Sequence, residues 1–389
     1  MLHNDHPNRM LDISRVGRKA DDLAKHLHET VIGQDEAVAQ IVQTYQTHLV
    51  GLSSTGRPIA TFLFLGPTGT GKTRIVESTA EALLNNPGAV IKIDCAEFQH
   101  DHEIAKLIGS PPGYVGHRES RPRLSQDAID KHHTESAKIS VVLFDEIEKA
   151  SDALWNLLLG ILDKGTLTLG DNQRVDFSRS LIFMTSNLGA AEMNAMLSPK
   201  LGFASAVADP NDGEKLSERI ASTGVEAARR RFTPEFINRL DKIVVFKPLG
   251  DAELRRILDI ELTAVQQRLY HSAPSCALKL RVFDGCKRYL LQQGTDTRYG
   301  ARHLKRTIER LVVQPVANLI ATEQVCNGDI ICVDFCSDSG QLDFWKECRE
   351  VPEQKTAAAA KEMTQIFHTD VGFWGWMNAA QVVAAPTCM

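Results

Sequence analysis

The sequence predicts an α/β fold in which a five-stranded parallel sheet is flanked by helices, followed by a smaller α+β domain. Five apolar runs of strand length lack the alternation of a half-exposed strand, which is typical of parallel strands buried on both faces. Amphipathic segments of helical period separate these runs. After Pro248 the pattern changes to helices followed by two short strands, and 389 residues suit two domains better than one.

The first predicted elements follow a polar stretch, residues 1–26, which we expect to be a loosely docked N-terminal arm. The five strands are expected at residues 60–65, 89–94, 139–145, 180–186 and 242–246. A helix is predicted after the first strand because five apolar residues share one helical face: Ile75, Val76, Ala80, Leu83 and Leu84. Asn85 to Gly88 end this helix, so the region forms a β-α-β unit.

The smaller domain is predicted from a second group of elements. Asp251 can begin a helix that runs to about Tyr270, and the remaining helices and strands are expected at residues 283–292, 300–323, 328–335 and 341–344. The expected divisions of the chain are an arm at 1–26, a large domain at 27–248, a small domain at 249–345 and an extension at 346–389. The sequence assigns no role to the extension.

The composition excludes several classes of protein. With 43% hydrophobic and 24% charged residues the chain is typical of globular proteins, and eight cysteines in this length do not indicate a disulfide scaffold. Lys and Arg total 44 against 49 for Asp and Glu, so the net charge of −5 argues against nucleic acid as a partner. We see neither a secretory signal nor a membrane span, and we expect a cytoplasmic protein without a membrane partner.

The strongest functional signal is the segment GPTGTGKT between the first strand and its helix. It consists of Gly66, Pro67, Thr68, Gly69, Thr70, Gly71, Lys72 and Thr73. The glycines allow a loop whose backbone N–H groups converge on phosphate, and the helix N-terminus adds its positive end. Lys72 is expected to reach the β and γ phosphates, and the Thr73 hydroxyl to hold Mg²⁺. An ordinary glycine turn is the alternative interpretation.

Polar residues also follow the third and fourth strands. Asp145 and Glu146 come at the end of a buried strand, where a P-loop ATPase holds Mg²⁺ and orients the attacking water. We assign Asp145 to the metal and Glu146 to the water, with simple helix capping as the alternative. Asn187 follows the fourth strand and can hydrogen-bond the water or the γ-phosphate, although Asn is common in turns.

Further motifs accompany the phosphate loop, namely LFDEIEKA (143–150), FMTSNLGA (183–190), RRFTPEFINRLD (230–241) and TRYGARHLKRTIE (297–309). Together with the loop they resemble the Clp family of AAA+ ATPases. The similarity is greatest to the second ATPase module of Clp disaggregases and protease-associated unfoldases, and it extends over about residues 27–345. Nothing in the chain resembles the family's first module, coiled-coil middle domain or N-terminal substrate domain.

The resemblance implies roles that spacing alone does not give. Arg239 would act as a finger in the neighbouring subunit's site, and Arg302 would be the sensor arginine that touches the γ-phosphate of its own subunit. Asn187 would be the polar sensor, while Val31 and Ile32 would contact adenine. A finger that acts in trans requires a head-to-tail interface, so a ring, in this family a hexamer, is expected. ATP hydrolysis would then drive protein unfolding.

A second implied feature is a loop that grips substrate. GSPPGYVGH (109–117) places Tyr114 and Val115 between glycines, and an aromatic tip can hold unfolded polypeptide without regard to sequence. A tight turn with a buried tyrosine is the alternative. Residues 118–138 are basic and rich in His where the Clp disaggregases carry an acidic, glycine-rich step, so the substrate preference is left open.

A Clp-type peptidase is a further candidate partner. Leu201, Gly202 and Phe203 match the aliphatic-Gly-aromatic tripeptide by which protease-associated members dock, although residues 50–52 and 371–373 match the same pattern. Only the position between the fourth and fifth strands favours 201–203.

The leading hypothesis from these motifs is an ATP-dependent unfoldase or remodelling chaperone. The alternatives are an AAA+ motor or loader that acts on DNA and a nucleotide-gated scaffold.

Overall fold

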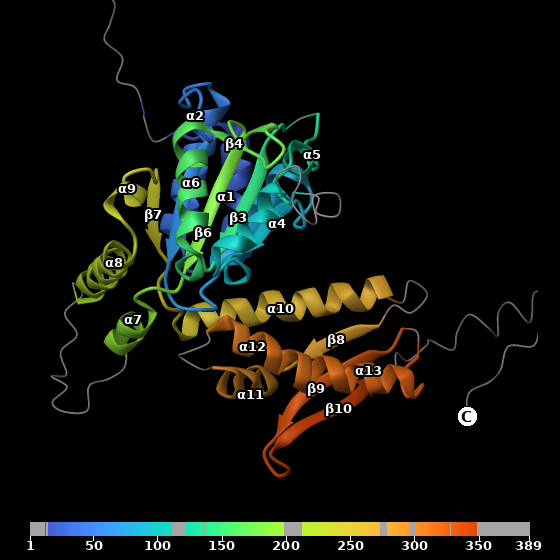
Figure 1. Ribbon diagram of the computed structural model, residues 1–389. Helices are drawn as coiled ribbons and strands as arrows, with labels where there is room; N and C mark the ends of the chain where they lie inside the picture. Colours follow the sequence, from blue (N-terminus) through green and yellow to red (C-terminus); the bar gives the residue numbers. More distant parts are fainter. Residues whose placement is uncertain are drawn as a thin grey trace, which may run out of the picture.

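A computed structural model gives the fold of the chain (Figure 1). It describes residues 12, 15–110, 122–135, 137–197, 212–272, 278–295, 300–326 and 328–347. The larger part contains a parallel sheet of five strands in the order β2-β3-β6-β1-β7. These strands are β1 (Ala60–Leu65), β2 (Val90–Asp94), β3 (Ser140–Asp145), β6 (Ser180–Ser186) and β7 (Lys242–Val245). The predicted fold class and all five predicted strands are confirmed.

Side chains of β1 alternate between two cores, one on each face of the sheet. Phe62 and Phe64 pack with helices α1 (Arg18–Thr30), α2 (Asp35–Leu49) and α3 (Lys72–Leu84). Leu63 and Leu65 pack on the opposite face with residues of α6 and α8. That face is covered by α4 (Ala105–Ile108), α6 (Asp152–Lys164), α7 (Ala190–Leu197), α8 (Asp212–Arg231) and α9 (Pro234–Ile237). The predicted first helix corresponds to α3.

The expectation of a loose arm over residues 1–26 is wrong for its last part. Helix α1 begins at Arg18, and Ala20, Leu23 and Leu27 are buried against α2 and α3. These three residues follow the i, i+3, i+7 spacing of a helix face that packs on a core. Residues 18–26 therefore belong to the packed large part of the molecule.

Short elements connect the main strands. They are the 3₁₀ turns η1 (Cys95–Glu97), η2 (Asp101–Ile104) and η3 (Ile147–Lys149), helix α5 (Gln126–Asp130), and the hairpin of β4 (Thr166–Thr168) and β5 (Arg174–Asp176). The hairpin and α5 were not anticipated from the sequence. Among the described residues, no helix combines the length and apolarity that crossing a membrane requires.

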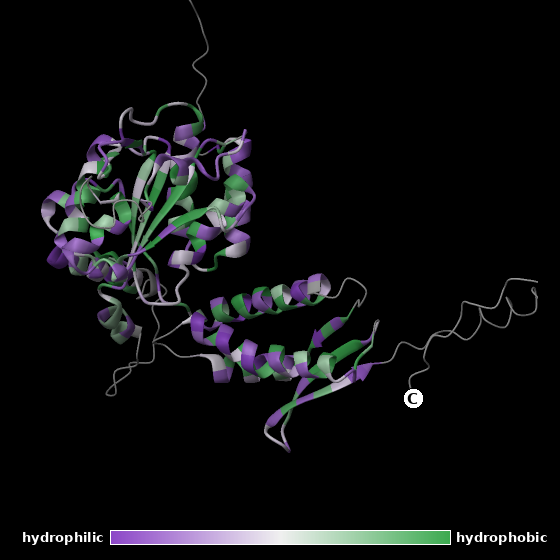
Figure 2. Cartoon of the chain, turned by 45° about the vertical axis from the view of Figure 1, so that its right-hand side comes forward, coloured by the Kyte–Doolittle hydropathy of each residue, from purple (hydrophilic) through white to green (hydrophobic). Residues whose placement is uncertain are grey.

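The smaller part has its own core and a three-stranded sheet in the order β10-β9-β8. Its elements are α10 (Asp251–Ser272), β8 (Lys279–Val282), α11 (Asp284–Gly294), α12 (Ala301–Ile308), the π-helical turn η4 (Glu309–Val313), α13 (Gln314–Ala321), β9 (Ile330–Cys336) and β10 (Gln341–Glu347). This core is formed by buried hydrophobic residues of its helices and sheet, and Figure 2 shows hydrophobic segments on these elements. The predicted helix at 300–323 is continuous, but a π turn interrupts its α geometry.

Candidate active site

The phosphate loop joins the end of β1 to the start of α3, and its glycines have backbone angles that other residues rarely adopt. Gly66, Gly69 and Gly71 have φ values of 141°, 79° and 102°. A Cβ at Gly66 would lie 2.5 Å from the Phe246 carbonyl oxygen, so no larger residue fits there without displacing β7. The N-terminus of α3 has no side-chain cap. Its N–H groups are available to an anion.

Lys72 is a buried cation at the first position of α3. Its ammonium group donates to the carbonyl oxygens of Gly66 at 2.6 Å and Pro67 at 2.8 Å. Burial lowers the pKa of Lys72 from 10.5 to about 8, against the opposing attraction of Glu148 and Asp145. Because no carboxylate of the described residues is in direct contact with the ammonium, the site favours a bound anion. The loop therefore fits a polyphosphate.

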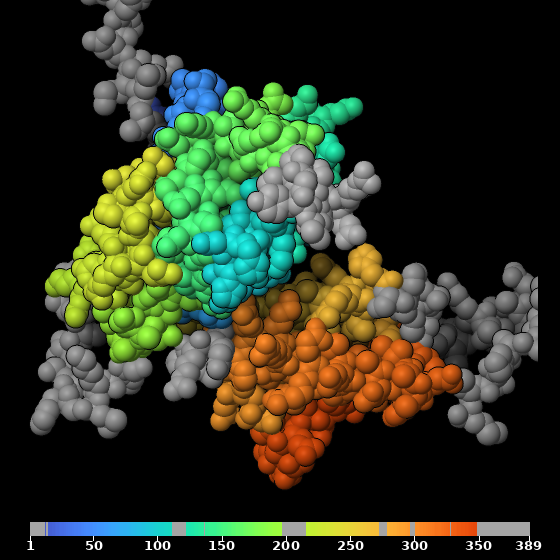
Figure 3. Space-filling view, viewed as in Figure 1, coloured from blue at the N-terminus to red at the C-terminus, as the bar shows by residue number. Residues whose placement is uncertain are grey.

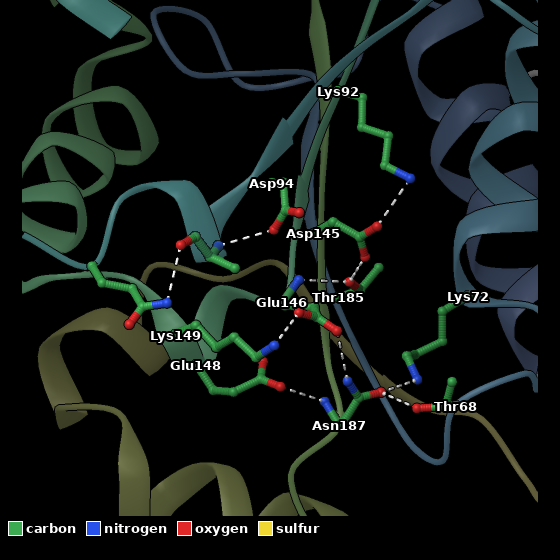
Figure 4. Close-up of polar contacts among 12 residues, drawn as sticks. Thr68, Lys72, Lys92, Asp94, Asp145, Glu146, Glu148, Lys149, Thr185 and Asn187 are labelled. Carbon is green, nitrogen blue, oxygen red and sulfur yellow. Dashed lines mark hydrogen bonds and ion pairs between the residues drawn. The ribbon is translucent and has the colours of Figure 1, made fainter. Parts of the chain in front are cut away.

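Asp145 lies at the carboxyl end of β3, as the sequence predicts (Figure 4). Thr185, near the end of the neighbouring strand β6, donates a short hydrogen bond from its hydroxyl to the Asp145 carboxylate. Lys92 on β2 forms an ion pair with the other carboxylate oxygen at 3.1 Å. Asp145 is thus oriented by residues of the two strands that flank its own.

Glu146 follows directly and has a left-handed backbone, with φ of 58°. A residue other than glycine costs about 1–3 kcal/mol in this conformation, so the surrounding contacts hold it in place. Its N–H donates to the Thr185 hydroxyl at 3.1 Å. Its carboxylate pairs with Lys149 at 2.5 Å and lies 3.5 Å from the amide nitrogen of Asn187. The turn therefore directs Glu146 toward the phosphate loop.

Asn187 connects the two halves of the site. Its side-chain oxygen accepts hydrogen bonds from Lys72 at 3.0 Å and from Thr68 at 3.3 Å, while its amide nitrogen faces Glu146. Its backbone N–H donates to the Glu148 carboxylate at 3.1 Å. Figure 4 shows Asn187 between Lys72 and Glu146. This is the place that the sequence predicts for a polar sensor.

The smaller part of the molecule contacts the phosphate loop directly. Ala301 donates its N–H to the Gly69 carbonyl at 3.2 Å, and the next residue, Arg302, is close enough to lower the pKa of Lys72. A Cβ at Gly300 would lie 3.0 Å from the Gly69 oxygen, so the approach depends on glycine. In Figure 3 the orange small part lies against this end of the large part.

The segment expected to contact adenine also lies beside the loop. Val31 and Ile32 are buried, and a Cβ at Gly71 would lie 3.8 Å from the Val31 side chain. Gln34, which the sequence did not single out, donates to the carbonyls of Thr70 and Lys247. It fixes the segment against both the loop and the end of β7. Contact with adenine stays a prediction.

Arg239 lies far from the phosphate loop of its own chain. Its carbonyl accepts a hydrogen bond from Thr61, at the start of β1, whereas the loop begins after the end of that strand. Thr61 and Gly66 are five positions apart along the strand, which corresponds to about 16 Å. The Arg239 guanidinium pairs instead with Glu235 at 3.0 Å and lies 3.9 Å from Asp163.

Two oxygen donors match the Mg²⁺ role that the sequence assigns to them. Thr73 lies in the first turn of α3, and its hydroxyl has no hydrogen-bond partner within the described part of the chain. Asp145 supplies a carboxylate from the adjacent strand. A hydroxyl and a carboxylate beside a phosphate-binding loop are the hard ligands that Mg²⁺ prefers, so the residues fit this ion.

Some predicted residues lie outside the described ones: Tyr114, Val115, Leu201, Gly202 and Phe203. Four residues that contact the predicted ones were not assigned a role from the sequence, namely Lys92, Glu148, Lys149 and Thr185. Lys149 and Glu148 belong to the same short motif as Glu146. Only the pairing of β2, β3 and β6 brings Lys92 and Thr185 to Asp145.

Two family models match the chain on either side of residue 248. One is "AAA domain (Cdc48 subfamily)" over residues 57–243, and the other is "C-terminal, D2-small domain, of ClpB protein" over residues 249–333. The chain belongs to the Clp family of AAA+ ATPases. Nucleotide binding at the phosphate loop is the property that this family implies.

Curated Clp proteins match most of the chain. "Chaperone protein ClpB 1" of Synechocystis is 36% identical over 92% of this chain and 37% of the relative. "Chaperone protein ClpC3, chloroplastic" of Oryza sativa is 37% identical over 85% of this chain and 34% of the relative. The Clp chain thus spans about a third of the length of these relatives.

A solved structure shows the same arrangement. "Closed State CryoEM Reconstruction of Hsp104:ATPyS and FITC casein" matches with a TM-score of 0.67 and 28% sequence identity. The match covers 84% of this Clp chain and 52% of the Hsp104 chain. The five-stranded sheet and the smaller C-terminal part therefore form a fold known in AAA+ proteins.

Proposed function

We propose that this protein is an ATP-dependent unfoldase or remodelling chaperone that hydrolyses ATP in a ring and threads polypeptide through a central pore. The observation that carries the proposal is the hydrogen-bonded series Lys72, Asn187 and Glu146 at the carboxyl end of the parallel sheet. It joins the group for phosphate binding to the group for activation of water. A scaffold that only binds nucleotide does not need such a connection.

Each residue has a defined task in this chemistry. Lys72 and the loop N–H groups bind the β and γ phosphates, and Arg302 contacts the γ-phosphate from the small domain. Thr73 and Asp145 hold Mg²⁺, which supplies charge neutralisation on the phosphates when bound. Glu146 orients the attacking water and accepts its proton, with Asn187 fixing the direction of the carboxylate.

The remaining charge on the transferring phosphoryl group is met by Arg239 of a neighbouring subunit. About 16 Å separates the Arg239 backbone from the phosphate loop of its own chain, and an arginine side chain reaches less than half as far. This distance supports the assignment. A contact of this kind joins unlike surfaces and closes into a ring. A hexamer is the expected size, with a large domain that ends at residue 248 and a small domain at 249–345 acting as one module.

Protein is the proposed substrate. The supporting observation is the name of the solved relative, which includes casein together with Hsp104, and the naming of the curated relatives as chaperones. Tyr114 and Val115 are proposed to grip the polypeptide, and Leu201 to Phe203 to dock a Clp-type peptidase. The cytoplasm is the proposed location.

ATP-dependent loss of fluorescence from a tagged fluorescent protein tests the proposal. We expect unfolding by the wild-type chain with ATP, no unfolding with Glu146→Gln, and a strong reduction with Tyr114→Ala at unchanged ATPase activity. Addition of a Clp peptidase would convert unfolding into degradation, and deletion of 201–203 would abolish only degradation. ATPase activity that responds to DNA and not to unfolded protein would contradict the proposal.

A further inference from the structure

Arg231, the last residue of α8, joins the turn after Glu146 to the segment that carries Arg239. Its guanidinium donates a hydrogen bond to the Glu148 carbonyl at 3.0 Å. The same group lies over the ring of Trp155, 4.5 Å from its centre. In Figure 1, α8 and α9 lie to the left of α6, the helix to which Trp155 belongs. Arg231 thus has one contact on the catalytic turn and one on α6.

Trp155 also contacts the turn after Glu146. Its indole N–H donates to the Ile147 carbonyl at 3.1 Å, and its side chain is buried. Two consecutive carbonyls, those of Ile147 and Glu148, are therefore bound by one stacked pair of side chains. The Glu148 carboxylate in turn accepts the N–H of Asn187. A shift of this turn changes the position of both Glu146 and Asn187.

The other end of the connection leads to Arg239 through packed aromatic rings. Phe232, next to Arg231, meets Trp155 edge to face at 5.5 Å and packs on Phe236 at 5.3 Å. The carbonyl of Phe236 accepts the N–H of Arg239 at 3.1 Å. Phe232 and Phe236 are both buried, and tightly packed side chains transmit displacement instead of absorbing it.

The turn after Glu146 also contains a carboxylate whose hydrogen-bonding capacity is not fully used by the described residues. One oxygen of the Glu148 carboxylate is buried and has no hydrogen-bond partner within the described residues. A buried acceptor without a partner is unfavourable, which favours exchange with a second arrangement when the contacts around Asn187 change. Bound phosphate would compete for Lys72, and Lys72 is a direct partner of Asn187.

We propose that Arg231 is a positioning residue that couples the catalytic turn of each subunit to the Arg239 of that same subunit. The nucleotide bound in one site then determines the position of the arginine that the same subunit presents to the neighbouring site. This inference rests on the proposed function, because it requires Arg239 to act in trans. Arg231 lies outside the phosphate loop and acts through its contacts with the Glu148 carbonyl and Trp155.

A subunit-doping experiment tests the coupling. Wild-type rings are mixed with increasing fractions of Glu146→Gln subunits, which bind ATP without turnover, and ATPase activity is plotted against that fraction. We expect a curve that departs from proportional loss, because blocked subunits influence their neighbours. With the double variant Glu146→Gln/Arg231→Ala the departure should fall at least twofold. Incorporation is checked by light scattering and thermal unfolding.

Two matched variants separate coupling from stability. Arg230→Ala removes the neighbouring arginine, which pairs with Glu226 on the exposed face of α8, and should leave the curve unchanged. Arg231→Lys keeps a charge and a donor but loses the planar face, so partial coupling is expected. Superimposable curves for Glu146→Gln with and without Arg231→Ala would overturn the inference, as would a straight line for Glu146→Gln alone.

The same assay distinguishes failure of the inference from failure of the proposed function. Glu146→Gln/Arg239→Ala subunits should lower activity further than Glu146→Gln subunits, because their neighbours lose the finger. If they do not, the trans role of Arg239 is wrong. If they do, while Arg231→Ala has no effect, the coupling through Arg231 alone is wrong.

Discussion

The two ends of strand β1 hold charged groups in different ways. At the carboxyl end, Lys72 is buried and is bound by the loop carbonyls and by Asn187 from another strand. At the other end, Arg239 pairs with Glu235 and Asp163, whose side chains are 62% and 47% exposed. Exposed ion pairs contribute about 0–1 kcal/mol and exchange readily. The first group is held rigidly within its own subunit, whereas the contacts of the second can exchange, as its proposed role in a neighbouring subunit requires.

The largest expected effect is at Glu146, in the site at the carboxyl end of the parallel sheet. Glu146→Gln keeps the shape of the side chain but removes the base, so kcat should fall by about 10²–10⁴-fold. Steady-state ATPase assays give kcat, and equilibrium titration with a fluorescent ATP analogue should show affinity within about threefold of wild type. Glu97→Gln, which removes a surface partner of Arg123, is the matched control. Unchanged turnover would refute the role of Glu146.

A smaller effect concerns the pH dependence of nucleotide binding. The pKa of Lys72 is lowered to about 8 in the free protein, so the lysine loses its proton above that pH, while bound phosphate favours the protonated form. ATP affinity should therefore be nearly constant from pH 7 to 8 and then weaken by up to about tenfold per pH unit. Titrations between pH 7 and 9.5 measure this.

The control for this prediction is Lys72→Met, which has no titrating group at this position. Its affinity should be weak and independent of pH above 7. Wild-type affinity that stays constant to pH 9.5 would show that Lys72 keeps its proton in the free protein, and that its burial does not lower its pKa.

The smallest effect is expected at the exposed end. Glu235→Gln removes one partner of Arg239 and should change the free energy of unfolding by less than about 1 kcal/mol, with ATPase activity within about twofold of wild type. Thermal unfolding and ATPase assays check both values, and Glu226→Gln on α8 is the control. A collapse of activity would mean that Glu235 fixes Arg239 for its task.

Local patterns predicted much of this molecule. The strands were found because each is a continuous apolar run, and the phosphate loop because its glycines and Lys72 are adjacent in sequence. The position of Asn187 beside Lys72 and Glu146 was implied by the family resemblance, and it agrees with a general property, since the carboxyl ends of parallel strands meet at one edge.

Other contacts depend on the pairing of distant segments and leave no local pattern. Lys92 reaches Asp145 only because β2 lies beside β3, and the stacking of Arg231 on Trp155 requires the last residue of α8 to lie beside α6. Helix α1 is a different case, because Ala20, Leu23 and Leu27 carry the spacing of a buried face and the charged residues between them obscured it. The Arg239 role came from the family resemblance and stays a prediction.

The most direct test of the central claim, an active site shared between subunits, is complementation between two inactive variants. Arg239→Ala supplies an intact Glu146, and Glu146→Gln supplies an intact Arg239. Mixed in one ring, they should restore ATPase activity at the junctions where an intact Glu146 meets an intact Arg239, to about a quarter of wild type at equal amounts by random assembly. Mixtures that stay as inactive as the separate variants, with mixed rings demonstrated, would contradict the account.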